Sequence, residues 1–209
     1  MSIPAIRRLA ACRAPVAQHG FSLVEVSIVT AIVLLIAIAG IPAINSYVIE
    51  NKVPRVGEEL QRFVARMKAN AQGAGTAPYR LIDTGSLANA LRSSSVVTVS
   101  GEGAAAVVAH GLGGSGTAGS GTIVLGPAAV GEGGSGSGFS LTLDDVNEAA
   151  CPSLASVMQR VSDIITVAGR SGAVTVKDAV AVPAVPYDPI LADAQCAEGD
   201  SNTFVFTVR

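Results

Sequence analysis

The stretch Gly20-Phe21-Ser22-Leu23-Val24-Glu25 opens a long apolar run, and it decides the fold of this chain. Glu25 is the only charged residue between Phe21 and Ile49. At about 1.5 Å per residue, a helix over residues 21–49 is long enough to cross a bilayer. A carboxylate inside such a segment costs about 2–3 kcal/mol. The sequence therefore predicts that Glu25 has a function that offsets this cost.

A basic leader precedes the apolar run. Residues 1–20 contain Arg7, Arg8 and Arg13 and no acidic residue. Positive charge beside an apolar helix favours retention of that end in the cytoplasm, so we expect the remainder on the periplasmic side. An ordinary signal peptide is cleaved after its apolar run rather than before it, and a plain membrane anchor needs no glutamate. Both alternatives therefore fit this arrangement less well.

The order of these features resembles the processing site and N-terminal helix of type IV prepilins. In that family a prepilin peptidase cuts after the glycine, here Gly20, and N-methylates the new first residue, here Phe21. The resemblance gives Glu25 an assembly role, in which its carboxylate pairs with the α-amino group of Phe21 in an adjacent subunit. It implies a helical homopolymer as the partner, and inner-membrane pilus assembly machinery that builds it.

Charge and residue usage disfavour other function classes. Loss of the leader leaves 11 Lys and Arg against 16 Asp and Glu, a formal charge of −5, so no specific nucleic-acid binding is expected. His19 leaves with the leader, and His110 lies in a glycine-rich stretch where a solvated side chain is expected. Neither a serine-hydrolase elbow nor a zinc-protease histidine pair occurs. The sequence therefore predicts neither an enzyme nor a cofactor.

The helix is expected to continue beyond the membrane segment. Residues 50–72 are amphipathic, with one apolar stripe that consists of Val56, Leu60, Phe63, Val64 and Met67. We therefore predict a transmembrane and assembly helix over 21–49, an amphipathic continuation over 50–72, and a globular head over 73–209. Expected helix bends lie at Gly40, Pro42 and Pro54, because proline removes a helix hydrogen bond.

Strand and helix patterns follow in the head. Strands are expected at 96–99, 105–109, 122–125, 139–143, 173–182 and 204–208, a helical turn at 86–92, and a helix at 152–168. Residues 101–138 are rich in glycine and serine, which predicts mobile surface loops. This order resembles the αβ-roll of pilins, an α+β fold in which the long helix packs on an antiparallel sheet with a disulfide-bounded C-terminal region.

Three cysteines are present, and Cys12 lies in the leader. Cys151 and Cys196 remain as an even pair in an exported segment, where a disulfide persists. Closure of a loop of about 45 residues contributes roughly 3–4 kcal/mol of stability. Two free thiols or a two-ligand metal site are the alternatives. Asp144, Asp145 and Glu148 either gather a calcium ion or form a solvated turn.

The resemblance implies a prepilin of the inner membrane that becomes part of an extracellular pilus filament, most like the type IVb major pilins. A minor pilin or a type II secretion pseudopilin is the alternative within this class. A membrane-anchored periplasmic binding or adhesin domain that does not polymerise is the alternative from another class. Whether such a filament serves cell adhesion, conjugation, motility or DNA uptake depends on its loops and on machinery encoded elsewhere.

Overall fold

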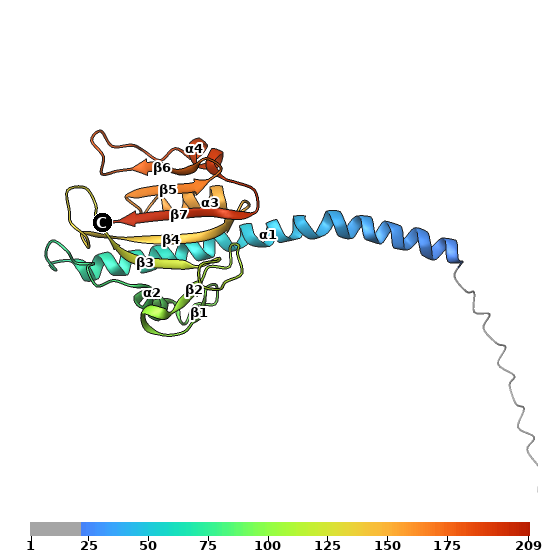
Figure 1. Ribbon diagram of the computed structural model, residues 1–209, viewed down its shortest axis with the longest axis horizontal. Helices are drawn as coiled ribbons and strands as arrows, with labels where there is room; N and C mark the ends of the chain where they lie inside the picture. The colour runs from blue at the N-terminus through green and yellow to red at the C-terminus, as the bar shows by residue number, and fades with distance from the viewer. Residues whose placement is uncertain (1–21) are drawn as a thin grey trace, which may run out of the picture. The chain divides into compact units, whose positions relative to one another are not determined.

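The computed structural model describes residues 22–209 in two units, which divide between Ile41 and Pro42. We call residues 22–41 the N-terminal segment and Pro42–Arg209 the C-terminal unit. Helix α1 (Leu23–Ala71) belongs to both. The C-terminal unit also contains α2 (Thr84–Leu91), β1 (Thr98–Ser100), the 3₁₀ turn η1 (Gly103–Ala105), β2 (Val107–Ala109), β3 (Ile123–Ala128), β4 (Gly138–Asn147), α3 (Cys151–Met158), β5 (Ile164–Gly169), β6 (Gly172–Asp178), α4 (Pro189–Gln195) and β7 (Asp200–Val208) (Figure 1).

A five-stranded antiparallel sheet in the order β3-β4-β7-β5-β6 forms the centre of the C-terminal unit. The last strand, β7, lies in its middle, so the end of the chain pairs on both sides (Figure 1). Strands β1 and β2 form a separate two-stranded sheet. The α+β fold expected from the sequence is therefore confirmed.

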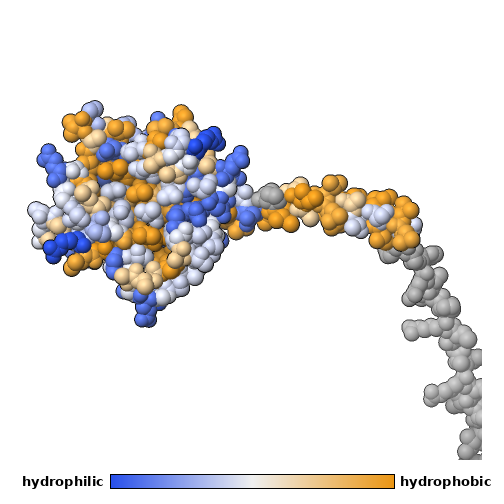
Figure 2. All heavy atoms as spheres, in the orientation of Figure 1, coloured by the Kyte–Doolittle hydropathy of each residue, from blue (hydrophilic) through white to orange (hydrophobic). Residues whose placement is uncertain are grey.

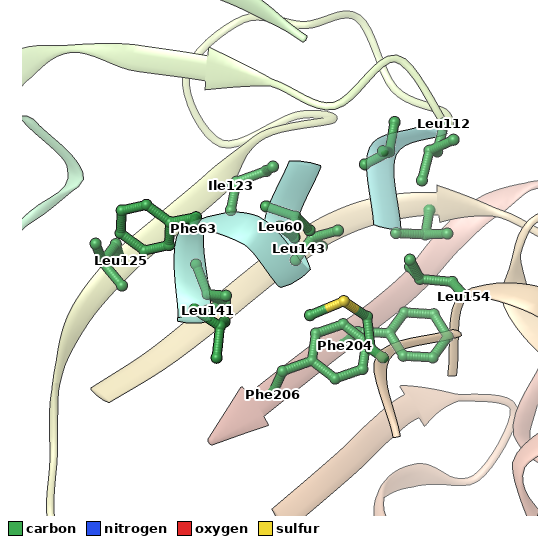
Figure 3. Packing of buried hydrophobic residues seen from close by; sticks show 14 of the residues in the cluster. Leu60, Phe63, Leu112, Ile123, Leu125, Leu141, Leu143, Leu154, Phe204 and Phe206 are labelled. Atoms are coloured by element: carbon green, nitrogen blue, oxygen red, sulfur yellow. The ribbon is translucent and has the colours of Figure 1, made fainter. Parts of the chain in front are cut away.

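The apolar stripe expected on α1 is confirmed as the part of the helix that packs on the sheet. Val56, Leu60, Phe63 and Val64 are buried and Met67 is half-buried. The rings of Phe63 and Phe139 meet edge-on with their centroids 6.3 Å apart, which joins α1 to β4. Figure 3 shows Leu60 of α1 among the leucine side chains of the sheet.

The helix expected at 152–168 is wrong in its second half. Helix α3 ends at Met158, and Ile164–Gly169 is strand β5 between β7 and β6. The apolar residues of this segment fit a helical period, but Ile165 and Val167 also alternate with half-buried neighbours and are fully buried. Because β-branched residues suit a pleated surface, pairing with β7 decides between the two structures.

The glycine- and serine-rich residues 101–138 are more ordered than expected. They contain η1, β2 and β3, and their buried residues include Leu112 and Ile123. The strand expected at 96–99 is observed as the shorter β1, Thr98–Ser100. Of the three valines expected in it, only Val99 lies in β1, and Val97 is buried just before the strand begins. Short strands are found here because the backbone pairs locally between glycine turns.

Helix α4 (Pro189–Gln195) has no counterpart among the helices expected from the sequence. Its first turn is capped by Asp188, whose carboxylate accepts from Ile190 N at 2.9 Å and Leu191 N at 3.0 Å. Asp188 followed by Pro189 is a typical helix start, so this signal was present in the sequence.

Candidate functional site

The predicted processing residues Gly20 and Phe21 lie outside the residues that the structure describes. Glu25 lies in the first turn of α1 and its side chain is exposed. The partial positive charge of a helix N-terminus favours a carboxylate at this position. Among residues 22–209 the two ion pairs are Arg62–Glu59 and Lys68–Asp163, so Glu25 has no cationic partner within the described chain.

The N-terminal segment presents apolar side chains on all sides. Leu23, Leu35 and Ile38 are 89%, 69% and 73% exposed. Figure 2 shows the face of the segment in view as mainly apolar, and α1 is the one described helix that is long and apolar enough to cross a membrane. Ser27 and Thr30 donate their hydroxyls at 2.8 Å to the carbonyls of Val24 and Val26. Because these hydroxyls are satisfied within the helix, the segment suits an apolar environment.

The three residues of the predicted bends all lie within α1. Pro42 and Pro54 do not interrupt its helical assignment, which runs from Leu23 to Ala71. No atom outside the local helix backbone comes within 4 Å of a Cβ built on Gly40. A bend at these three positions stays a prediction.

Gly57 lets the last turn of α3 approach α1 closely. A Cβ at this position would clash with the side chain of Val157. One turn further along α1, Gln61 Nε2 donates to the Val157 carbonyl at 2.7 Å. The bond satisfies one of the free carbonyls at the C-terminus of α3. Sequence reasoning missed both residues, because a glycine and a glutamine do not contribute to an apolar stripe.

The predicted Cys151–Cys196 disulfide is confirmed, with the two Cα atoms 5.9 Å apart. It joins the start of α3 to the residue that follows α4. Cys151 is fully buried and belongs to the hydrophobic core. The bonded sulfurs exclude two free thiols and the two-ligand metal site as descriptions of this structure.

Comparison with known proteins identifies the chain through its C-terminal unit. The model of the PilS N-terminal family matches residues 62–209. The chain belongs to the PilS N-terminal family. This family assignment confirms the resemblance to type IV pilins, whose members are structural subunits rather than enzymes. A search of curated proteins found no match.

The PilS-family chain is also similar to solved structures. One is a type IVb pilin from Salmonella typhi, with 24% identity and a TM-score of 0.46 over 73% of this chain and 95% of that chain. Another is TcpA, a type IV pilin from Vibrio cholerae El Tor biotype, with 14% identity and a TM-score of 0.49 over 76% of this chain and 99% of that chain.

The PilS family match begins within the second half of α1. It includes the disulfide, the whole sheet and α2 to α4. It does not include Gly20, Phe21 or Glu25. The roles of these residues in processing and assembly therefore stay predictions.

His110 is buried rather than solvated, so the sequence prediction for this residue is wrong. Leu112 N donates to its Nδ1 at 3.0 Å, and its Nε2 lies 2.7 Å from the carbonyl oxygen of Asp144. Because Nδ1 accepts, the ring proton lies on Nε2 and the ring is neutral. Burial lowers the pKa of His110, against the raising effects of its bond to the Asp144 carbonyl and of nearby carboxylates. His110 therefore joins the segment between β2 and β3 to strand β4.

The acidic residues at the end of β4 and just after it contact two separate segments of the chain. The Asp144 carboxylate accepts from Thr122 N and, at 2.9 Å, from Thr122 Oγ1. Glu148 accepts from Gly199 N at 3.3 Å. No group of three or more His, Cys, Asp or Glu suited to a metal ion occurs among residues 22–209. Asp144 and Asp145 lie half-buried within β4 rather than in the solvated turn expected from the sequence, and Glu148 follows just after the strand.

Proposed function

We propose that this chain is the structural subunit of a type IV pilus of the type IVb kind. A prepilin peptidase cuts it after Gly20 and N-methylates Phe21, and inner-membrane assembly machinery then adds it to an extracellular filament. The observation that carries the proposal is the contrast within α1. Its N-terminal segment exposes apolar side chains on every side, while its second half is anchored in the C-terminal unit.

The exchange of lipid for neighbouring helices explains how one segment serves both states. Lipid tails and the side chains of Leu, Ile and Val are similarly apolar, so transfer from bilayer to filament changes apolar burial little. The transfer needs a directional contact to set the axial position. Glu25, exposed in the first turn of α1, supplies it by pairing with the α-amino group of Phe21 in the adjacent subunit.

The experiment that tests assembly is Glu25→Ala, with Glu50→Ala as the matched control. Both glutamates are exposed on α1, but Glu50 follows the apolar run. Glu25→Ala should insert at least as well as wild type, because it removes a costly charge. Sheared-filament yield should nevertheless collapse, since loss of one partner of a buried ion pair costs about 3–5 kcal/mol. Glu50→Ala should give wild-type yield. Equal filament yield from cleaved Glu25→Ala and wild type would remove the assembly role.

Processing is tested separately by the intact mass of the mature protein. Cleavage after Gly20 and one added methyl group are expected, and Gly20→Val should block cleavage because it fills the small-residue site. A mature protein that keeps its leader favours the non-polymerising membrane-anchored binding domain. A cleaved, methylated subunit that is scarce in purified filaments favours a minor pilin or pseudopilin.

A further inference from the structure

A polar pocket of about 240 Å³ lies between α1 and the segment that follows α2. One wall is formed by α1, with Arg62 and Arg66 one helical turn apart on the same face. Ser93 and Ser94 form the opposite wall. Its apolar lining includes Phe63, a core residue labelled in Figure 3. The pocket lining therefore combines two arginines and two serines with buried apolar residues of the core.

The positive charge of this pocket is not neutralised by the described chain. Arg62 pairs with Glu59 at 3.3 Å, whereas Arg66 belongs to neither of the two ion pairs among residues 22–209. The pocket lining contains two arginines and one carboxylate, that of Glu59. By contrast, the C-terminal unit as a whole has 11 Lys and Arg against 15 Asp and Glu. The pocket is thus a positive site on an acidic domain.

The Ser94 hydroxyl accepts two hydrogen bonds from the backbone. Its Oγ accepts from Val96 N at 3.2 Å and from Val97 N at 3.4 Å. A hydroxyl has two acceptor lone pairs and one donor, so both acceptor positions are used and the proton remains available. The pocket lining therefore offers donors from guanidinium and hydroxyl groups, which is the chemistry that binds an oxyanion.

We propose that this pocket binds a small oxyanion group, a phosphate, sulfate or sugar carboxylate, with Arg66 as its principal ligand. The planar guanidinium fork matches the paired oxygens of such groups. The volume of about 240 Å³ falls below the roughly 300–1,000 Å³ of pockets for drug-sized ligands, so a single charged group or monosaccharide fits better than a larger molecule. This binding belongs to the subunit itself and does not depend on polymerisation.

The test is isothermal titration calorimetry on the full chain in non-ionic detergent at low ionic strength, with inorganic phosphate, sulfate and D-glucuronate as separate probes. Arg66→Ala should weaken binding about tenfold or more, because it removes a charge-assisted contact. Arg55→Ala is the matched control, since Arg55 is exposed on α1 and does not line the pocket. Glu59→Gln should strengthen binding, because it removes the one carboxylate of the lining.

Preference among the three probes identifies the source of the group. Binding of phosphate or sulfate that depends on Arg66 assigns a tetrahedral oxyanion, and preferential, Arg66-dependent binding of glucuronate assigns a sugar acid. Near-ultraviolet circular dichroism confirms that each variant keeps the wild-type fold. The proposal is overturned if no probe binds to wild type, or if Arg55→Ala weakens binding as much as Arg66→Ala.

Discussion

Both halves of α1 carry large apolar side chains, but these side chains have different surroundings in the two halves. In the N-terminal segment Leu34 is 57% exposed, and in the C-terminal unit Leu60 is fully buried. Composition alone gives both halves a helix, but only the second half has a sheet on which to pack. The difference shows that the apolar residues of one helix stabilise the C-terminal unit at one end and remain available for lipid or other subunits at the other.

Truncation of one leucine in each half of α1 should give the largest difference in stability between the two halves. Leu60→Ala should lower the free energy of unfolding of the C-terminal unit by about 3–5 kcal/mol, because it leaves a cavity in a packed core. Leu34→Ala should change it by less than about 0.5 kcal/mol. Denaturation of the full chain in detergent, followed by the near-ultraviolet signal of its tyrosines, measures both. Equal losses from the two variants would contradict the division of α1.

Removal of the Cys151–Cys196 disulfide tests whether the two halves of α1 respond differently to a loss of stability in the C-terminal unit. Cys151→Ser with Cys196→Ser should destabilise the C-terminal unit by about 3–4 kcal/mol on the loop-entropy argument. Because α3 packs against α1 at Gly57, amide hydrogen exchange should rise in the second half of α1. Exchange in the detergent-covered N-terminal segment should stay unchanged. An equal rise in both halves would show that they unfold together.

Alanine substitutions at two glycines of α1, one in each unit, should change stability by smaller amounts. Gly57→Ala should destabilise the C-terminal unit by about 1–3 kcal/mol, because the added methyl group overlaps Val157. Gly40→Ala adds the same methyl group where no atom outside the local helix lies within 4 Å. It should leave the C-terminal unit unaffected and favour the local helix by up to about 1 kcal/mol. Thermal unfolding of the two variants distinguishes these outcomes, and stabilisation by Gly57→Ala would contradict the close packing.

The smallest expected effect is a pH dependence confined to the C-terminal unit. Burial lowers the pKa of His110 below its ordinary 6.5, so the unfolded chain binds a proton that the folded chain resists. The stability linked to His110 is therefore fully present above pH 6.5 and declines as pH falls toward the lowered pKa. Nearby Asp144, Asp145 and Asp200 oppose this shift and limit its size.

His110→Gln isolates that contribution. The variant is neutral at every pH, so its stability should fall less than that of wild type between about pH 7.5 and 5.5, even if its stability at neutral pH is lower. Urea denaturation at the two pH values measures the difference. Identical pH dependence in both proteins would assign the acid sensitivity to other groups.

Prediction from sequence succeeded where the pattern is local. The span of α1, the stripe from Val56 to Val64 and the start of α3 near Pro152 follow from spacing and capping preferences. The disulfide followed from the even number of cysteines after the leader is excluded. These features depend on neighbouring residues or on composition, so no knowledge of the fold was needed.

The tertiary structure decided what depends on distant partners. Ile164–Gly169 fits either helix or strand by its own pattern, and pairing with β7 and β6 makes it β5. The buried ring of His110 has one local partner, Leu112, but its second partner is the Asp144 carbonyl of β4, 34 residues further along the chain. Gly57 and the pocket at Arg66 arise only when α1 meets α3 and the segment after α2. A sequence determines local preference, whereas burial and partner choice are set by long-range packing.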